Sequence, residues 1–158
     1  MQLRYAVPED RDAIMALIDS VYSEYGDRLF PAGADRDLLD IAGHYFQAGG
    51  AFVVLDDAGQ IHGTHAVLPN ADRPGVCHFY RLYLAPAWRG SAWGPRLMQW
   101  ALDWGREHGM HRVEFWSDTR FTRAHAFFHR LGFQRDGRVR QMDDGAMPYQ
   151  EYFFYRDL

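Results

Sequence analysis

The apolar residues of the chain are spaced in two ways, one typical of strands and the other of helices. Short alternating or wholly apolar runs predict strands, and apolar residues every three or four positions predict helices with one buried face. The predicted order is strand, two helices, three strands, helix, strand, helix and two strands. The predicted strands are residues 2–6, a hairpin within 51–68 that turns at 57–59, 76–84, 111–117, one opening at Phe133, and 150–155.

Four helices are predicted, and each has a boundary signal or an apolar face. Pro8 begins the first helix, because proline suits the first turn. Asp118 or Thr119 is expected to cap the fourth helix, which ends at Gly132. The apolar faces are Ile14, Leu17, Ile18, Val21 and Tyr22; Leu38, Ile41, Ala42, Tyr45 and Phe46; Leu97, Trp100, Ala101 and Trp104; and Phe121, Ala124, Phe127, Phe128 and Leu131.

This order describes a single α/β domain over residues 1–158, with a sheet covered by helices. A chain of 158 residues is long enough to bury a proper core. Apolar residues make up 47% and aromatic residues 16% of the chain, so we expect a packed core rich in rings and no disordered segment.

The charge and the cysteine content narrow the class of protein. The net charge is −4 and no dense basic tract occurs, which argues against a nucleic-acid partner. Cys77 is the only cysteine, so an internal disulfide is excluded and a reducing compartment is expected. The sequence shows no apolar signal core and no run long enough to cross a bilayer. We therefore expect a cytoplasmic protein without a membrane partner.

The segment from Tyr80 to Gly94, YRLYLAPAWRGSAWG, is the most informative in the chain. A strand runs through a proline-containing turn into a helix, whose first N–H groups lack intrahelical partners and carry the positive end of the helix dipole. Small residues let an anion approach the main chain closely, and an arginine adds positive charge. The segment therefore suggests a phosphate site, although small residues also suit a purely structural turn. The residues concerned are Arg89, Gly90, Ser91, Ala92 and Gly94.

Two motifs in this order resemble the GNAT superfamily of acyl-CoA-dependent N-acetyltransferases. The first is RLYLAPAWRGSAWG, which matches the cofactor-binding turn of the family, and the second is AHAFFHRLGF from Ala124 to Phe133, which matches its late helix ending in Gly-Phe. The resemblance covers essentially the whole chain. It implies a mixed, mostly antiparallel sheet of about six or seven strands flanked by about four helices.

The resemblance also implies a cofactor, acetyl-CoA, and its binding residues. The main chain from Gly90 to Gly94 would hold the diphosphate, and the strand before this turn would bind the pantetheine arm as an added strand. The strand 113–117 would splay away and open a slot for the thioester. The implied cofactor-binding residues are Leu82, Tyr83, Leu84, Arg89, Gly90, Ser91, Ala92, Trp93, Gly94 and Phe128.

The chain departs from the family pattern at three positions of this region. Ala92 stands where the family usually has glycine, so a forced positive φ is expected to cost on the order of 1 kcal/mol. Pro95 removes one N–H just after the turn, where proline is well tolerated. Phe128 stands where many members have a tyrosine that acts as an acid, and it has no proton to give.

Acyl transfer to an amine needs a base, an oxyanion site and a proton for the leaving thiolate. His78 matches the position at which many members carry a carboxylate, and its imidazole can accept a proton directly or through water. A main-chain N–H of the strand 82–84 meets the second need. His125 is the candidate acid, with water as the alternative. His62 and His65 lie on opposite faces of one strand, so at most one points to the site.

The acceptor is expected to be a primary amine of a small molecule or a peptide. Two loops, 22–34 and 137–149, flank its entrance by the resemblance. The rings of Tyr25 and Phe30 and the acidic residues of these loops, such as Glu24, would suit a cationic amine. Arg120, with Asp118 beside it, would suit an acceptor that carries a carboxylate. The sequence leaves this choice open, as it does a non-catalytic acyl-CoA-binding module. The ring-rich strand YFFY could offer an edge for a possible homodimer, but a core strand needs the same residues, so the sequence leaves the oligomeric state open.

Overall fold

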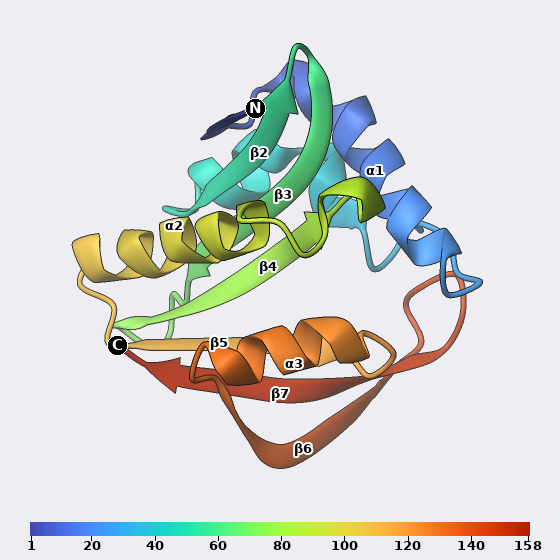
Figure 1. Ribbon diagram of the computed structural model, residues 1–158. Coiled ribbons are helices and arrows are strands. Elements are labelled where there is room, and N and C mark those ends of the chain that lie inside the picture. Colours follow the sequence, from blue (N-terminus) through green and yellow to red (C-terminus); the bar gives the residue numbers. More distant parts are fainter.

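Seven strands form one sheet in the computed structural model, which describes residues 1–158 (Figure 1). Their order across the sheet is β1-β2-β3-β4-β5-β7-β6, and only β4 and β5 are parallel. The mixed, mostly antiparallel sheet implied by the family resemblance is therefore confirmed. The strands are β1 (Gln2–Tyr5), β2 (Ala51–Asp57), β3 (Gln60–Pro69), β4 (Val76–Leu84), β5 (Arg112–Asp118), β6 (Gln134–Met142) and β7 (Tyr149–Asp157).

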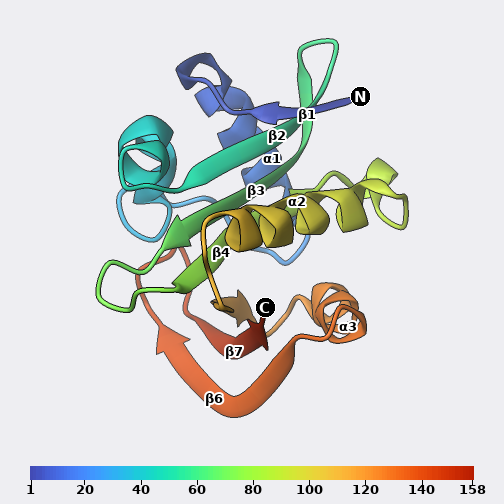
Figure 2. The ribbon, with the colours of Figure 1, turned by 90° about the vertical axis from the view of Figure 1, so that its left-hand side faces the viewer.

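Three α-helices and four shorter helical turns cover this sheet. The second predicted helix forms as two short pieces, since the backbone leaves the helical region at Asp40 (φ −143°, ψ 77°). Figure 2 shows α2 and α3 on one face of the sheet, with α1 and η3 on the other. The helical elements are η1 (Pro8–Asp10), α1 (Arg11–Ser23), η2 (Arg36–Leu39), η3 (Ala42–Phe46), η4 (Pro86–Trp88), α2 (Trp93–Glu107) and α3 (Thr122–Arg130).

The core has one layer on each face of the sheet, because the inner strands bury residues on both sides. On the α1 face, Ile14 and Ile18 of α1 pack against Phe52 and Val54 of β2. On the α2–α3 face the core is rich in rings, as the composition predicted. Its aromatic members are Phe79, Trp104, Phe115, Phe128, Phe133 and Phe154. Cys77 is fully buried in this layer, where burial raises the pKa of its thiol to about 12, so it is a small packing residue.

Two local expectations have different outcomes. The predicted hairpin between β2 and β3 is confirmed, with Ala58 and Gly59 at its tip in the positive-φ region that tight hairpin turns require. The predicted capping of α3 is wrong. The helix begins at Thr122 without a side-chain cap, because the Asp118 carboxylate accepts bonds from the main chain and guanidinium of Arg120 instead.

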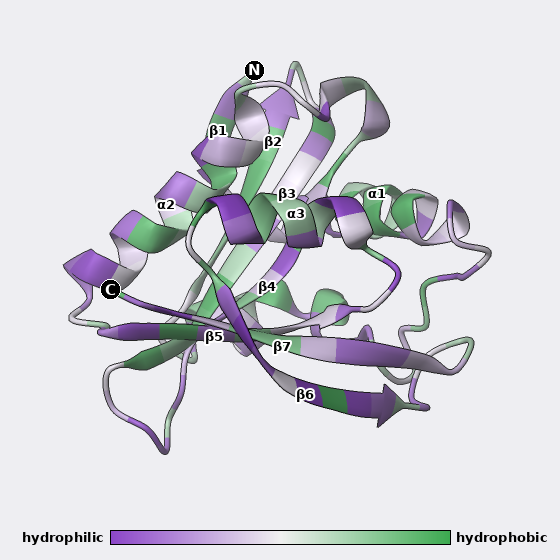
Figure 3. Ribbon diagram, turned by 60° about the horizontal axis from the view of Figure 1, so that its bottom comes forward, coloured by the Kyte–Doolittle hydropathy of each residue, from purple (hydrophilic) through white to green (hydrophobic).

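The ring-rich strand YFFY is not an edge of the sheet. It lies within β7, which pairs with β5 on one side and with β6 on the other. The edge is β6, which is largely exposed and hydrophilic (Figure 3). Arginines stack over the outer rings, with Arg138 3.6 Å from the centroid of Phe153 and Arg140 4.3 Å from that of Trp116. The sequence argument for a homodimer through this strand therefore fails.

Candidate functional site

β4 and β5 lie side by side only at their first residues. Three residue pairs join them, the last being His78 with Glu114, and beyond it the strands separate (Figure 1). The expected splaying of residues 113–117 is thus confirmed. Farther along β4 there is a bulge, where Arg81 has a φ of 57° and the pairing with β3 shifts register. Since only β3 pairs with this part of β4, the edge of β4 that faces β5 is free.

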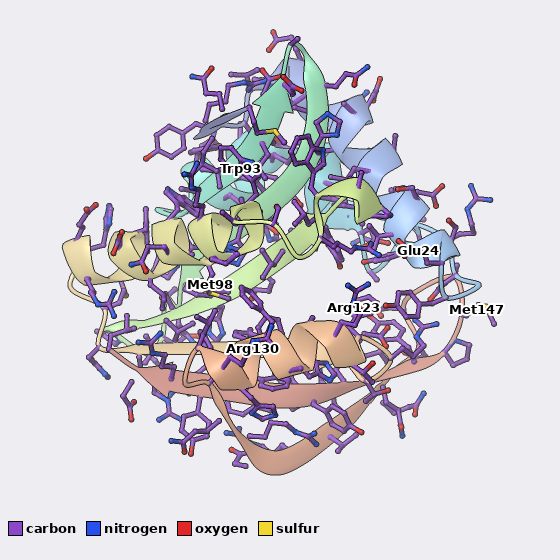
Figure 4. All side chains as sticks on the ribbon, viewed as in Figure 1. Glu24, Trp93, Met98, Arg123, Arg130 and Met147 are labelled. Carbon is purple, nitrogen blue, oxygen red and sulfur yellow. The ribbon has the colours of Figure 1, made fainter.

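A cavity of about 690 Å³ lies in the split between β4 and β5. Residues from both faces of the sheet line it, so it passes through the sheet. Figure 4 shows Met98 projecting from α2 toward the sheet at this level. On the α2–α3 face the lining residues are His65, Phe79, Leu82, Met98, Phe115, Ser117, Ala124 and Phe128. We call this part of the cavity the donor side, and the part on the α1 face the acceptor side.

The bulge is held by the side chain of Arg81, which is almost fully enclosed. Its Nε and Nη2 donate to the carboxylate of Asp37 at 3.0 and 2.5 Å, and its Nη1 donates to Asp35 at 2.8 Å and to the hydroxyl of Tyr22 at 3.1 Å. Burial opposes ionisation of Asp37, but the Arg81 charge outweighs it and lowers the pKa of this carboxyl. The network fastens the segment after α1 to the bulge, and this segment forms a wall of the acceptor side.

The acceptor side carries more acidic than basic groups. Its acids are Asp27, Asp35, Asp37, Asp118, Asp144 and Glu151, and its bases are Arg28, Arg36, Arg81, Arg120 and Arg140. Arg120 is already paired with Asp27 at 2.9 Å and with Asp118 at 2.7 Å, and Arg140 with Glu151 at 2.6 Å. A substrate carboxylate would have to compete with these pairs for Arg120. The acids exceed the arginines by one, and five of the six acids are paired with Arg81, Arg120 or Arg140.

The two rings expected at the acceptor entrance do not line the cavity. Tyr25 packs against Phe121, with 5.0 Å between the ring centroids, and lies 5.9 Å from the Arg120 guanidinium. Phe30 is partly exposed in the same loop. Neither ring lines the cavity, so either ring could contact a substrate only outside the cavity lining.

The turn between β4 and α2 leaves several main-chain donors free. The amide of Ser91 donates to the carbonyl of Trp88 at 3.3 Å, and that of Trp93 to the Ser91 hydroxyl at 3.3 Å. The amides of Gly90, Ala92 and Gly94 donate to no acceptor in the protein. Free N–H groups at the start of a 15-residue helix are hydrogen-bond donors that suit a diphosphate.

The expected strain at Ala92 is not present. Ala92 has a φ of −68°, an ordinary helical value, and it is Gly90 that takes the positive φ of 76°. Open space surrounds the position of a Cβ at Gly90. The turn therefore places its glycine where a side chain would be strained and its alanine where a side chain is harmless.

Arg89 is paired within the protein. It donates to both carboxylate oxygens of Glu24 at 2.6 and 2.7 Å and to the carbonyl of Leu84 at 3.1 Å. This pair lowers the pKa of Glu24 and raises that of Arg89. Figure 4 shows Glu24 and Arg123 on the same side of the molecule. The Arg89 charge is thus shared with Glu24, and the free amides are the donors available without a rearrangement.

His78 lies at the inner end of the split and lines the cavity on the acceptor side. Its Nε2 is 3.0 Å from the side-chain amide nitrogen of Asn70. Burial lowers the pKa of His78, so the ring is neutral near pH 7. A neutral ring is the form that accepts a proton.

His125 and Phe128 lie on the same side of α3 but only Phe128 touches the cavity. Phe128 packs in the core, with its centroid 4.8 Å from that of Phe115. His125 is 7% exposed and lies behind the cavity wall, where its Nε2 is 3.1 Å from the hydroxyl of Ser117. His125 is therefore linked to the cavity only by its contact with Ser117.

His65 is the one of the two β3 histidines that lines the cavity, in agreement with the expectation that at most one would. It is 1% exposed, and neither ring nitrogen has a hydrogen-bond partner. Its ring lies edge-on to Phe79 and Trp100. Burial lowers its pKa from 6.5 to about 3, so the ring stays neutral in the folded protein.

His65 therefore makes stability depend on pH. The unfolded chain binds a proton at this ring below pH 6.5 and the folded chain does not, so stability falls as the pH decreases from about 6.5 toward 3. Between pH 7 and pH 5 we expect His65 to account for a loss of about 2 kcal/mol. Urea unfolding at both pH values should show this part of the loss disappearing in His65→Leu and remaining in His62→Leu. An equal loss in wild type and His65→Leu would contradict the assignment.

The sequence pattern of the acetyltransferase (GNAT) family matches residues 14–133, most of the chain. The chain belongs to this family. GNAT enzymes use acetyl-CoA, so the protein is an acetyl-CoA-dependent N-acetyltransferase. It is 28% identical over 138 residues to aminoalkylphosphonate N-acetyltransferase of Salmonella typhimurium, covering 85% of each chain. It is 27% identical over 143 residues to mycothiol acetyltransferase of Pseudarthrobacter chlorophenolicus, covering 85% of this chain and 43% of that protein.

Solved structures agree on the fold. An acetyltransferase from Streptococcus agalactiae superposes with a TM-score of 0.85 at 19% identity, covering 99% of this chain and 98% of that one. The yncA protein of Salmonella typhimurium, solved with its cofactor acetyl-CoA, superposes with a TM-score of 0.75 at 16% identity, covering 99% and 93%. None of the helices in this GNAT protein has the length and apolarity needed to span a membrane.

Several residues of the site were not predicted from the sequence. Arg81 had a signal, because it is the only charged residue among the apolar and aromatic residues of its strand, VCHFYRLYL. Asp37 had none, since its partner Arg81 is 44 positions away, and Glu24 was expected only as an acid of the entrance loop because its partner Arg89 is 65 positions away. Ser117 becomes notable only once the strands are seen to split beside it.

Proposed function

We propose that this GNAT protein transfers the acetyl group of acetyl-CoA to a primary amine of a small molecule or a peptide, by direct attack within the cavity. The observation that carries the proposal is the free edge of β4, which leads from the split to the unpartnered amides at the start of α2. An extended, amide-bearing ligand that ends in a diphosphate matches this combination.

The residues present fit acetyl-CoA. The free amides of Gly90, Ala92 and Gly94 would bind the diphosphate, and the edge formed by Leu82–Leu84 would bind the pantetheine arm. The bound donor supplies an activated acetyl thioester. A main-chain N–H of the same edge would stabilise the oxyanion that develops on the acetyl carbonyl. Phe128 and Met98 exclude water from the donor side.

The amine would enter from the acceptor side. The acidic groups there would attract a cationic amine, and the exposed rings of Tyr25 and Phe30 would contact it outside the cavity lining. Asp118 and Arg120 would contact the acceptor, Asp118 through its charge, and Arg120 only after giving up a bond to one of its two aspartates. A relative is named for aminoalkylphosphonates, so an anionic acceptor is the second class to test.

His78 is our candidate for the base. The attacking amine must lose a proton, and the neutral ring of His78 would take it at Nε2 in place of the Asn70 contact, or through water. His78→Gln is expected to lower kcat about tenfold, because glutamine fills the place without accepting a proton and water takes over in part. The affinity for acetyl-CoA should not change. An unchanged kcat would remove His78 from the mechanism.

The activity is tested by the release of CoA thiol from acetyl-CoA with a panel of acceptors. The panel contains a polyamine, an amino acid, an aminoalkylphosphonate and peptides with free N-termini. The chain contains no lysine, since all 17 of its basic residues are arginine, so no lysine of the enzyme can serve as an acceptor. We expect the release of CoA thiol to depend on the acceptor and to be fastest with the polyamine, the most cationic member of the panel. Tight binding of acetyl-CoA without release by any acceptor would indicate a binding module instead.

A further inference from the structure

Ser117 is placed opposite the bulge, on the other wall of the split. The last paired residues are His78 and Glu114, and both Arg81 and Ser117 lie three positions beyond that pair on their strands. Ser117 lines the cavity on the donor side, on the same face of β5 as Phe115. Apart from the neutral ring of His65, the wall of the donor side is apolar and includes Phe79, Leu82, Met98, Phe115 and Phe128. Its hydroxyl is therefore a rare polar group at a place where a thioester would lie.

His125 holds this hydroxyl from behind. The two residues are 9% and 7% exposed, and the His125 ring hydrogen-bonds to the Ser117 hydroxyl and to the main chain of Asp118. The ring is otherwise packed against Tyr152 and Phe154. When Nε2 carries the hydrogen and donates it to Oγ, the hydrogen of Ser117 is left to point elsewhere, and the cavity is the open direction.

Titratable groups face this pair from three elements. Asp118 follows Ser117 on β5, His129 lies one turn after His125 on α3, and Arg135 approaches from β6. Burial lowers the pKa of His125, so the ring is neutral at the pH at which the enzyme would work. A neutral ring can orient a hydroxyl but is a poor source of protons.

We propose that the Ser117 hydroxyl donates a hydrogen bond to the sulfur of the acyl donor, with His125 as the residue that positions it. The inference rests on the proposed function. The new bond joins the amine nitrogen to the acetyl carbon, and the carbon–sulfur bond breaks with its electron pair going to sulfur. The proton lost by the amine goes to His78 or to water, and the thiolate takes its proton from water. Ser117 stabilises the charge on sulfur and keeps its own proton.

This role would give the sulfur a hydrogen-bond donor, which Phe128 cannot provide in place of the family's tyrosine. A thiolate against a wholly apolar wall is unfavourable, and a hydrogen bond to a charged atom offsets part of that cost. The readout is the pKa of the thiol of bound CoA, which needs no acceptor and no turnover. We expect the Ser117 hydroxyl to lower it by about one unit relative to Ser117→Ala, a tenfold change in the ionisation constant.

The experiment is an ultraviolet difference titration of the thiolate, comparing the complex with CoA against the complex with desulfo-CoA. Wild type and Ser117→Thr, which keeps the hydroxyl, should give the lower pKa, and Ser117→Ala the higher one. His125→Phe should move the pKa toward that of Ser117→Ala, because the hydroxyl is no longer oriented. A contact that only ties α3 to β5 would change stability in these variants and leave the thiol pKa unaltered.

Two failures are distinguishable. If wild type binds CoA and all four proteins give the same thiol pKa, Ser117 has no role at sulfur and the proposed function is untouched. If wild type binds neither CoA nor desulfo-CoA, the proposed function fails and the role of Ser117 fails with it.

Discussion

Replacing Arg81 with methionine is expected to lower the free energy of unfolding by about 3–5 kcal/mol. The substitution leaves the carboxylates of Asp35 and Asp37 buried without their counter-charge, and these side chains are only 3% and 10% exposed. It also releases the segment after α1 from the bulge in β4. The positive φ at position 81 is equally demanding for arginine and methionine, so the comparison isolates the side chain. Urea unfolding at pH 7 measures the effect.

A matched control is Arg28→Met. Arg28 is also bonded to an aspartate, Asp19, but its side chain is 71% exposed, so its loss should cost far less than the loss of Arg81. Adding Asp35→Asn and Asp37→Asn to Arg81→Met should restore much of the lost stability, because no buried charge then lacks a partner. A loss for Arg81→Met as small as that for Arg28→Met would show that the network does not hold the bulge.

Replacing Gly94 with glutamate is expected to weaken acetyl-CoA binding about 100-fold, because a carboxylate would lie beside the amides that bind the diphosphate. Gly94 is in the first turn of α2 without a positive φ, and a Cβ there meets only Leu84 Cδ2 at 4.0 Å. A negative charge in this turn favours the helix dipole, so the free protein should be as stable as wild type or more so. Calorimetric titration and thermal unfolding measure the two effects.

Gly94→Gln separates charge from size. Glutamine has nearly the same volume as glutamate, so we expect most of the affinity to survive in Gly94→Gln. The difference between the two variants should shrink as salt is added, since screening weakens repulsion between charges. Equal affinities of the two variants would mean that no anion binds at the start of α2.

The order of elements could be predicted because each depends on nearby residues. The apolar face of α1 and the turn at Ala58 and Gly59 follow from spacing and turn chemistry. The second predicted helix had the right spacing, but Asp40 interrupts it, and the result is two short turns. The free amides at the start of α2 could be predicted for the same local reason. The positive φ expected at Ala92 occurs instead at Gly90, where it causes no strain because glycine has no side chain.

The site itself depends on contacts between distant residues, which a single sequence does not reveal. The rings of YFFY suit an edge strand and a core strand equally, and they do not show that β6 pairs with this strand or that Arg138 covers Phe153. Arg89 was assigned to a phosphate because its partner, Glu24, is 65 positions away. His125 was assigned to the cavity from helix spacing, but spacing along a helix does not show that Ser117 of β5 lies between His125 and the cavity.

The central claim is that the free amides of the β4–α2 turn bind a diphosphate while the β4 edge binds the arm attached to it. Amide chemical shifts of ¹⁵N-labelled protein during titration with acetyl-CoA test it directly. We predict saturable shifts for Gly90, Ala92 and Gly94 and for Leu82–Leu84, with the far edge strand β6 unaffected. Unchanged amides in the turn at saturating acetyl-CoA, or shifts confined to another surface, would contradict the claim.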